Sequence, residues 1–338
     1  MTAYMDHKDL ANYHISPDRA RQIADAAREV MEQIADAERE AGRRAGSVTL
    51  LAATKTRDVG EIMAALDAGI ALIGENRPQE VTAKISGLRR LCAERGWSIG
   101  TGSRDGGVGG VNDEVDEIGI NGGVNGNDGA NDGGVNGNDG DAGNGGAVGS
   151  GVVTASHESG LTSVGSVDTR ETPATGRHID FHLIGQLQSN KIGKVLPVVD
   201  TIESVGSMAL AEKISRRAVA HAVSVGVLVE VNESGEPAKS GCNPKNALDI
   251  ARRIGIMGGL DLRGFMTIGA HVDDEIVIRK GFSHLRQLRD QLLESGEPGT
   301  DHCLELSMGM TGDMRYAIAE GSTIVRVGTG IFGQRAFI

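Results

Sequence analysis

Several features that define large protein classes are missing from this sequence. It contains no apolar run of membrane-spanning length, and residues 1–14 are polar rather than a charged and then apolar leader, so neither a transmembrane segment nor a secretory signal is predicted. Aromatic residues make up only 3% of the chain, and no basic stripe with interleaved aromatic residues appears. We therefore expect a cytoplasmic protein with no nucleic-acid or membrane partner.

Cysteine is also scarce. Cys92, Cys242 and Cys303 are scattered along the chain without the CxxC spacing of a metal or redox site, and no metal site is predicted. They are expected to be reduced packing residues, although the glycine-flanked loop around Cys242 also allows a reactive thiol.

The negative charge of the chain is concentrated in one segment. Residues 101–176 hold 12 Asp and Glu against two Arg and contain 22 of the 50 glycines, so the rest of the chain is close to neutral. An octapeptide at residues 122–129 recurs at residues 133–140. Such a segment buries too little apolar surface to offset chain entropy, and a low-complexity, disordered acidic insertion is predicted. A calcium-binding repeat is the alternative, but the period of 11 residues fits its nine-residue pattern poorly.

Outside that insertion, helical and strand-like segments alternate. Ser16 and Pro17 are predicted to begin a helix that continues to about residue 43. Eight strand-like runs follow, at residues 48–55, 71–73, 179–184, 200–202, 225–231, 262–266, 303–306 and 323–327. Between them lie helical patterns at residues 59–68, 78–90, 189–196, 208–222, 244–254, 281–293 and 313–320.

This alternation predicts an α/β fold, a single (β/α)8 barrel of the TIM type with an N-terminal helix, built from residues 1–100 and 177–338. An open doubly wound sheet is the alternative, but no G-x-G-x-x-G motif follows the first strand. In a barrel of this type the functional residues lie at the carboxyl ends of the strands. The acidic insertion joins the second helix to the third strand, and we expect it on the opposite face.

Lys55 ends the first strand-like run. A lysine amine at the rim of a buried sheet is held away from water, which disfavours its charged form and frees it to condense with an aldehyde. Lys55 is therefore a candidate Schiff-base residue. The alternative is a solvated lysine where the chain reaches the surface, and a phosphate site near the same rim would decide between the two.

The last strand offers such a site, because it runs directly into Gly328, Thr329 and Gly330. Glycines there let backbone N–H groups turn toward an anion, and Thr329 adds a hydroxyl. The preceding strand leads to Ser307, and the loops after strands seven and eight are the usual phosphate site of such barrels. An ordinary glycine turn is the alternative.

Arg326 lies two residues before Gly328, on the same side of the last strand. If that side is the barrel interior, the guanidinium would face the far edge of a ring held between the phosphate site and Lys55. An arginine facing a pyridine nitrogen keeps it unprotonated and weakens the ring as an electron sink, which disfavours strong carbanion chemistry. A salt-bridging structural arginine is the alternative.

Six short segments occur in a recognisable order along the chain. They are Ala53–Lys55, Gly74–Glu80, Phe181–Lys191, Lys239–Gly241, Leu306–Thr311 and Val325–Gly333. Together they resemble the pyridoxal-phosphate homeostasis proteins, which are fold-type III barrels similar to the N-terminal domain of alanine racemase. The resemblance extends over nearly all of the chain outside residues 101–176.

The resemblance implies that pyridoxal 5'-phosphate is the cofactor, held as a Schiff base on Lys55. It implies that Ser307, Gly328 and Thr329 bind the phosphate, that Arg326 faces the pyridine nitrogen and that Asn76 lines the ring. His182 belongs to the family's signature, but a core histidine with satisfied hydrogen bonds explains it equally well. No catalytic residue is assigned.

By the same resemblance, the protein is expected to carry and buffer the cofactor and to regulate vitamin B6 and amino-acid homeostasis without an established catalytic activity. Its candidate partners are pyridoxal phosphate and apo forms of enzymes that use it, and a monomer is expected.

Two alternatives remain open. The first is an amino-acid racemase of the alanine racemase type, which needs a tyrosine base supplied by a partner subunit's additional domain. Against it, this chain ends 10 residues after Gly328, and the surroundings of Tyr4, Tyr13 and Tyr316 do not suggest an activated base. The second is a barrel for another phosphorylated ligand, with Lys55 solvated.

Overall fold

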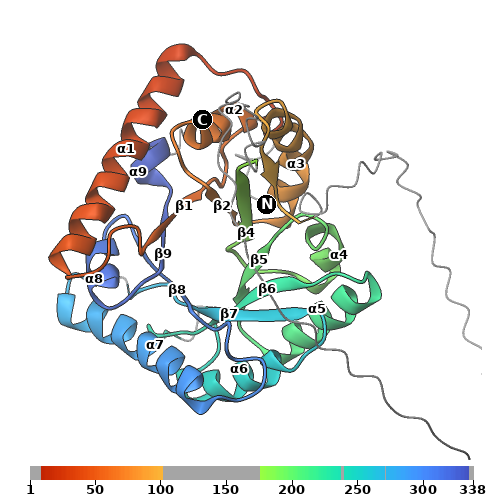
Figure 1. Ribbon diagram of the computed structural model, residues 1–338, viewed down its shortest axis with the longest axis vertical. Coiled ribbons are helices and arrows are strands. Elements are labelled where there is room, and N and C mark those ends of the chain that lie inside the picture. Colours follow the sequence, from red (N-terminus) through yellow and green to blue (C-terminus); the bar gives the residue numbers. More distant parts are fainter. Residues whose placement is uncertain (1–8, 102–175, 237–239, 271, 335–338) are drawn as a thin grey trace, which may run out of the picture. The chain divides into compact units, whose positions relative to one another are not determined.

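Eight parallel strands close into a barrel with the helices arranged around it (Figure 1). This computed structural model describes residues 9–101, 176–236, 240–270 and 272–334. The ring closes where β2 pairs with β4, with Ile73 opposite Phe181. The predicted (β/α)8 barrel is thereby confirmed, since a doubly wound sheet would leave two strand edges unpaired. The barrel strands are β1 (Thr49–Ala53), β2 (Leu72–Glu75), β4 (His178–Leu183), β5 (Thr201–Val205), β6 (Val225–Glu230), β7 (Leu260–Met266), β8 (Glu305–Met310) and β9 (Ile324–Val327).

One short strand was not expected from the sequence. β3 (Ser98–Ile99) pairs with the start of β4, Ser98 lying opposite His178. The acidic insertion begins shortly after β3. Most of it, like Tyr4 and Lys239, lies outside the described residues, so its predicted disorder, its position and the calcium alternative remain predictions.

The helices follow the predicted pattern closely. Ser16 caps the first helix by accepting a hydrogen bond from the Arg19 N–H at 3.2 Å, with proline in the first turn. One helix begins earlier than predicted, at Glu275, because Asp274 accepts hydrogen bonds from the N–H groups of the first turn. The helices are α1 (Pro17–Glu40), α2 (Val59–Asp67), α3 (Pro78–Ala93), α4 (Ile192–Val195), α5 (Met208–Ala220), α6 (Ala247–Gly255), α7 (Glu275–Ser295), α8 (Met314–Ala319) and α9 (Thr329–Phe332), with 3-10 turns at Ser189–Lys191 and Pro244–Asn246.

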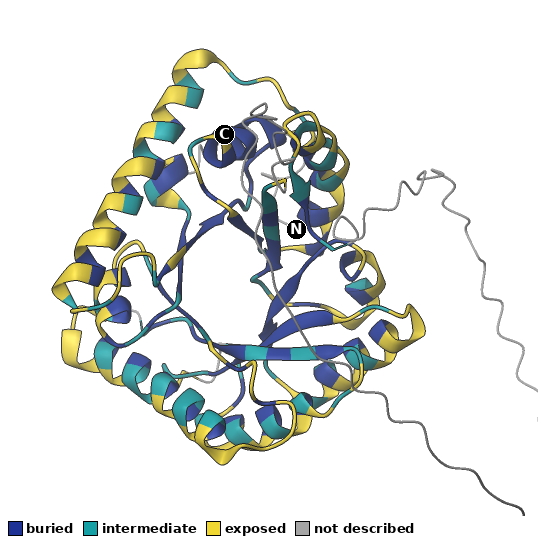
Figure 2. Ribbon diagram, viewed as in Figure 1, coloured by how far each residue is buried: buried dark blue, intermediate teal, exposed yellow. Residues whose placement is uncertain are grey.

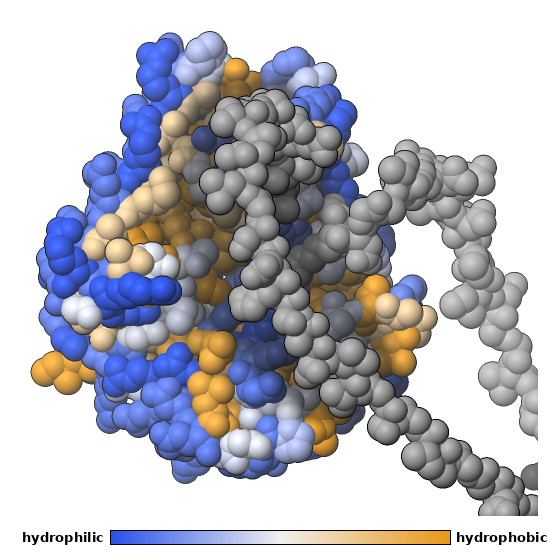
Figure 3. All heavy atoms as spheres, viewed as in Figure 1, coloured by the Kyte–Doolittle hydropathy of each residue, from blue (hydrophilic) through white to orange (hydrophobic). Residues whose placement is uncertain are grey.

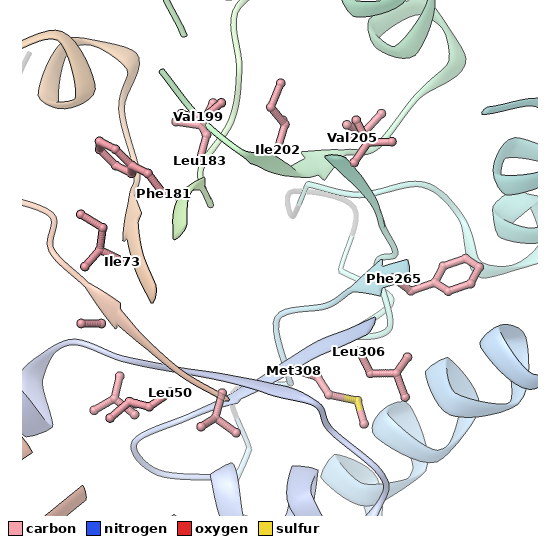
Figure 4. Packing of buried hydrophobic residues seen from close by; sticks show 14 of the residues in the cluster. Leu50, Ile73, Phe181, Leu183, Val199, Ile202, Val205, Phe265, Leu306 and Met308 are labelled. Carbon is pink, nitrogen blue, oxygen red and sulfur yellow. The ribbon is translucent and has the colours of Figure 1, made fainter. Parts of the chain in front are cut away.

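The main hydrophobic core lies between the strands and the helices. Alternate strand residues point away from the barrel axis and pack under the helices, as Figure 4 shows for Phe181 and Leu183 and for Leu306 and Met308. The strands and the inward faces of the helices are buried, whereas the outward helix faces are exposed (Figure 2). Hydrophilic side chains accordingly cover much of the outer surface in Figure 3.

The barrel interior is divided into an apolar part and a polar part. A small apolar cluster fills the region beside β1, β2 and β9 and consists of Leu51, Ala53, Leu72 and Ile324, with Ile184 packed against it. The polar part lies toward β4, β5 and β8 and forms part of the candidate site.

The three cysteines are buried and carry free thiols. Burial raises the pKa of Cys92 and Cys242 to about 11 and that of Cys303 to about 12. The thiols are therefore protonated near neutral pH, which supports the packing interpretation over a reactive Cys242. Among the described helices, none has the length and apolar character that crossing a membrane requires.

Candidate functional site

Lys55 lies on a tight turn at the carboxyl end of β1. The N–H of Arg57 donates to the carbonyl of Thr54 at 3.0 Å, which places Lys55 and Thr56 at the centre of a four-residue turn. Thr56 has a φ of 64°, a left-handed conformation that is rare for a β-branched residue and costs about 1–3 kcal/mol. The half-buried Lys55 is thus presented by a constrained turn.

The end of β9 lies directly beside this turn. Ala52 pairs with Val327, and Gly328 is so close to Ala53 that a Cβ at position 328 would lie 3.2 Å from the Ala53 carbonyl oxygen. Because the strands are parallel, the Lys55 turn and the segment that begins at Gly328 lie at the same rim of the barrel. The Lys55 turn and Gly328 thus lie side by side, as the sequence led us to expect.

α9 follows immediately after Gly328. The N–H groups of Ile331 and Phe332 donate to the Gly328 carbonyl at 3.1 and 2.9 Å, and Thr329 is exposed to solvent. Gly328 and Thr329 are therefore accessible from the rim.

Arg326 points into the barrel interior, where only 6% of the residue is exposed. Its Nη1 donates to the carbonyl and the hydroxyl oxygens of Ser307, each at 2.7 Å, and its Nη2 donates to the carbonyl of Thr267 at 2.7 Å. Strand alternation left open which side of β9 Arg326 occupies, and its burial and hydrogen bonds place it on the interior side. Its predicted role toward a ring nitrogen remains a prediction.

Ser307 and His182 belong to one buried chain of polar groups. The Ser307 hydroxyl donates to Glu203 Oε2 at 2.6 Å, and Glu203 Oε1 lies 2.7 Å from His182 Nδ1. His182 is therefore a core histidine with a buried carboxylate partner. Sequence reasoning missed Glu203; its only signal was an acidic residue within the buried strand Thr201–Val205.

The charged groups of this hydrogen-bond network stabilise one another's charged forms. Burial alone would lower the pKa of His182, but the hydrogen bond and charge of Glu203 raise it above its ordinary value. Burial alone would raise the pKa of Glu203, but His182, Arg326 and Ser307 together hold it below its ordinary value. Both shifts favour the charged forms, so His182 and Glu203 form an ion pair. The Ser307 hydroxyl links this pair to the Arg326 guanidinium.

Asn76, which follows β2, contributes an orphaned polar atom near the site. It is half-buried, and its Oδ1 is buried without a hydrogen-bond partner in the described part of the chain. A Cβ at position 185 would lie 2.2 Å from the Asn76 carbonyl oxygen, so glycine is required where the two loops meet. Thr56 Oγ1 is also buried without a hydrogen-bond partner among the described residues, and buried polar atoms in this state are suited to a polar ligand.

The loop after β6 also reaches this end of the barrel. Ser240 donates a hydrogen bond to Glu230, the last residue of β6, and burial raises the pKa of that carboxyl group although Ser240 and Arg326 oppose the shift. Ser240 is thereby tied to a buried carboxyl group that interacts electrostatically with Arg326.

Comparison with known proteins identifies the family. Residues 146–336 match the alanine racemase N-terminal domain. The chain is 39% identical over 159 residues to the pyridoxal phosphate homeostasis protein of Vibrio cholerae, a match that covers 47% of this chain and 66% of that protein. Other bacterial proteins of that name match at 33% identity and above, and the match covers up to 82% of their length.

Solved structures share the fold. An unknown protein from Bifidobacterium adolescentis is 55% identical with a TM-score of 0.74, covering 96% of this chain and 100% of that one. PipY of Synechococcus elongatus, solved with pyridoxal phosphate bound, is 22% identical with a TM-score of 0.54, covering 89% of this chain and 100% of that one. The barrel and the sequence matches together show that the chain belongs to the pyridoxal phosphate homeostasis protein family.

Proposed function

We propose that the chain binds pyridoxal 5'-phosphate between the Lys55 turn and the segment that begins at Gly328. The observation that carries the proposal is the contact between Ala53 and Gly328, which brings a lysine turn and a glycine-containing turn together at one rim. When bound, the cofactor supplies an aldehyde carbon that a lysine amine can attack, with loss of one water, and an electron-withdrawing ring. Lys55 is the lysine positioned for that bond.

The remaining predicted site residues fit a phosphorylated ring in this position. Backbone N–H groups and the Thr329 hydroxyl at the end of β9 would bind the phosphate. Asn76 would offer its unsatisfied Oδ1 to a polar group at the ring edge. Arg326, fixed by Ser307 and Thr267, would face the ring nitrogen from the barrel interior. A direct contact of Ser307 with the phosphate requires its hydroxyl to exchange Glu203 for that ligand.

For the protein with bound cofactor, we propose the function of a carrier and regulator of that cofactor. It would act in vitamin B6 and amino-acid homeostasis. The names of the curated relatives support it. Of the described tyrosines, Tyr13 lies against Arg90 of α3, with the guanidinium 4.8 Å from the ring centroid, and Tyr316 packs partly buried on α8. These contacts give neither ring the role of a base opposite Lys55, which favours the carrier over a racemase.

Covalent trapping tests the binding site. The purified chain is incubated with pyridoxal 5'-phosphate, treated with borohydride and digested with trypsin. We expect one pyridoxyl adduct, on the peptide of residues 45–57 that contains Lys55. Lys55→Ala should lose this adduct, whereas Lys194→Ala, which removes an exposed lysine on α4, should retain it. Adducts scattered over surface lysines, or an unchanged yield in Lys55→Ala, would contradict the assignment and favour another phosphorylated ligand.

A second measurement separates the carrier from the racemase. Loaded protein is incubated with enantiomerically pure alanine, and the enantiomers are resolved by chiral chromatography. The carrier function predicts no conversion above the level of free cofactor, whereas catalytic loss of enantiomeric purity that disappears in Lys55→Ala would establish the racemase.

A further inference from the structure

Lys84 of α3 is one of the largest fully buried side chains of the described chain. Lysine is almost never buried completely unless it is paired, because its ammonium group loses hydration. The side chain lies on the outer side of the barrel wall, between α3 and the ends of β1 and β2. Because burying the ammonium group is energetically unfavourable, it requires a specific partner.

The ammonium group of Lys84 has two close partners. Nζ donates to Glu75 Oε1 at 2.6 Å and to the backbone carbonyl of Thr54 at 3.0 Å. The Thr54 hydroxyl donates to the same Glu75 oxygen at 2.6 Å. Glu80 also faces the ammonium group, its Oε2 lying 3.9 Å from Nζ. Glu75, Lys84 and Thr54 thus form a closed buried cluster behind the strand ends.

The Thr54 carbonyl belongs to the peptide bond that joins Thr54 to Lys55. The same oxygen accepts the Arg57 N–H that closes the Lys55 turn, while the Thr54 N–H donates to the Gly74 carbonyl at 2.9 Å. The residue before Lys55 is therefore held by its N–H, its hydroxyl and its carbonyl. The buried ammonium group thereby fixes the plane of the peptide bond between Thr54 and Lys55.

Stability alone does not explain this pair. Replacing a buried lysine and its acidic partner by apolar residues of similar volume is often neutral or stabilising. What an apolar side chain cannot supply is a donor for the Thr54 carbonyl at the point where the strand turns. The pair is suited to hold that carbonyl, and with it the turn that contains the strained Thr56.

We propose that Glu75 and Lys84 are positioning residues for Lys55: they fix the Thr54–Lys55 peptide and so determine where the Lys55 amine enters the site. The ligand of that amine rests on the function proposed above, but the positioning is a property of the protein without ligand. The two can therefore be tested separately.

The first test needs no cofactor. In Lys84→Met, amide hydrogen exchange is followed at Arg57, whose N–H donates to the Thr54 carbonyl. The control is Glu38→Gln, because Glu38 is also buried and accepts hydrogen bonds from Gly46, Ser47 and Val48 at the opposite end of β1. We expect Arg57 exchange to accelerate in Lys84→Met and to remain at the wild-type rate in Glu38→Gln. Equal acceleration in both variants would reduce the pair to a general structural role and overturn the proposal.

The second test measures the rate at which pyridoxal 5'-phosphate is trapped on the peptide of residues 45–57. Because misplacement of a reacting group by ~1 Å can cost about 100-fold, Lys84→Met should be trapped roughly 10-fold to 100-fold more slowly. The adduct should still be on Lys55. A wild-type rate in Lys84→Met would refute the positioning role, whereas failure of the wild-type chain to form any adduct would refute only the proposed cofactor.

Variants of Thr54 keep the proposal testable if Lys84→Met does not fold. Thr54→Ser preserves the hydroxyl that donates to Glu75, and Thr54→Val preserves the shape but removes that hydrogen bond. We expect the serine variant to be trapped at close to the wild-type rate and the valine variant to be slow. Equal rates in the two variants would show that the cluster does not control Lys55.

Discussion

Arg326 and Glu203 are joined through a single hydroxyl group, that of Ser307, which accepts from Arg326 Nη1 at 2.7 Å and donates to Glu203 Oε2 at 2.6 Å. The link connects β9 to β5 across the interior of the barrel by way of β8. Because His182 binds the other oxygen of Glu203, a cationic side chain lies at each end of this hydrogen-bond network. The guanidinium is therefore held in place through Ser307 by a buried carboxylate.

Ser307→Ala should test this link. The variant removes an acceptor for Arg326 and a donor for Glu203 while both charges stay buried, so we expect a loss of about 1–3 kcal/mol in the free energy of unfolding. Urea denaturation measures the loss. Ser215→Ala is the control, because its hydroxyl donates to the Gly258 carbonyl at the surface. A Ser307 variant no less stable than the Ser215 variant would show that the link is dispensable.

The ion pair of His182 and Glu203 predicts a pH dependence of stability. The raised pKa of His182 contributes stability that is complete below its unfolded value near 6.5 and is lost as the pH rises through the folded value. The lowered pKa of Glu203 contributes stability that is present above about 4.5 and is lost as the pH falls through the folded value. The loss of stability in His182→Gln relative to wild type should therefore be largest between the two unfolded pKa values, at about pH 4.5 to 6.5.

Urea denaturation at a series of pH values from 4 to 9 measures that difference. We expect it to shrink on the alkaline side as His182 loses its proton. The control is His221→Gln, which alters an exposed histidine at the end of α5. A difference for His182→Gln that is constant across the series would indicate a packing effect rather than a charge effect.

The sequence predicted the barrel because short strand-like runs alternate with helical patterns along the chain. It did not reveal β3, since two residues carry no measurable periodicity. It also placed the start of α7 too late, because exposed apolar residues such as Ile276 obscure the helical pattern in its first turn. The strands of the barrel were thus easier to predict than the exact bounds of the elements or the short strand β3.

The site could be predicted only in part. Lys55 and Gly328 were placed at one rim because both follow strands of the same parallel barrel. The contact between Ser307 and Glu203 joins residues 104 positions apart and depends on the stagger of the strands, which single-sequence patterns do not contain. Glu75 appeared only as part of a motif, because its contact with Lys84 requires the docked position of α3.

Gly328→Ala should weaken cofactor binding. Its φ of −114° suits any residue, but the added Cβ would lie 3.2 Å from the Ala53 carbonyl oxygen and 3.4 Å from the Ala53 Cβ. The methyl group must therefore displace the end of β9 or the end of β1, and we expect roughly a 10-fold loss of affinity for pyridoxal 5'-phosphate, which corresponds to about 1.4 kcal/mol. Equilibrium titration followed by cofactor absorbance gives the affinity.

Gly193→Ala provides the matched control for that substitution. Gly193 lies in α4, and a Cβ there meets no atom within 4 Å. The alanine should leave the affinity unchanged and raise stability by up to ~1 kcal/mol, because glycine is unfavourable in a helix. Equal affinities of the Gly328 and Gly193 variants would mean that the close approach of β9 to β1 is not needed for binding.

Glu75 should make the stability of the wild-type chain fall between weakly acidic and weakly alkaline pH. Burial raises its pKa to about 8, although the charge of Lys84 opposes the shift and Glu80 adds to it. A carboxyl group whose folded pKa is raised contributes stability that is complete below its unfolded value and is lost as the pH rises through the folded value. Glu75→Gln cannot titrate and still offers an oxygen to Lys84 and Thr54, so its stability should change less between pH 5 and 8 than that of wild type. Denaturant unfolding across this range decides the point: parallel curves for the two proteins would show that Glu75 is ionised throughout, with the Lys84 ammonium group compensating fully for its burial.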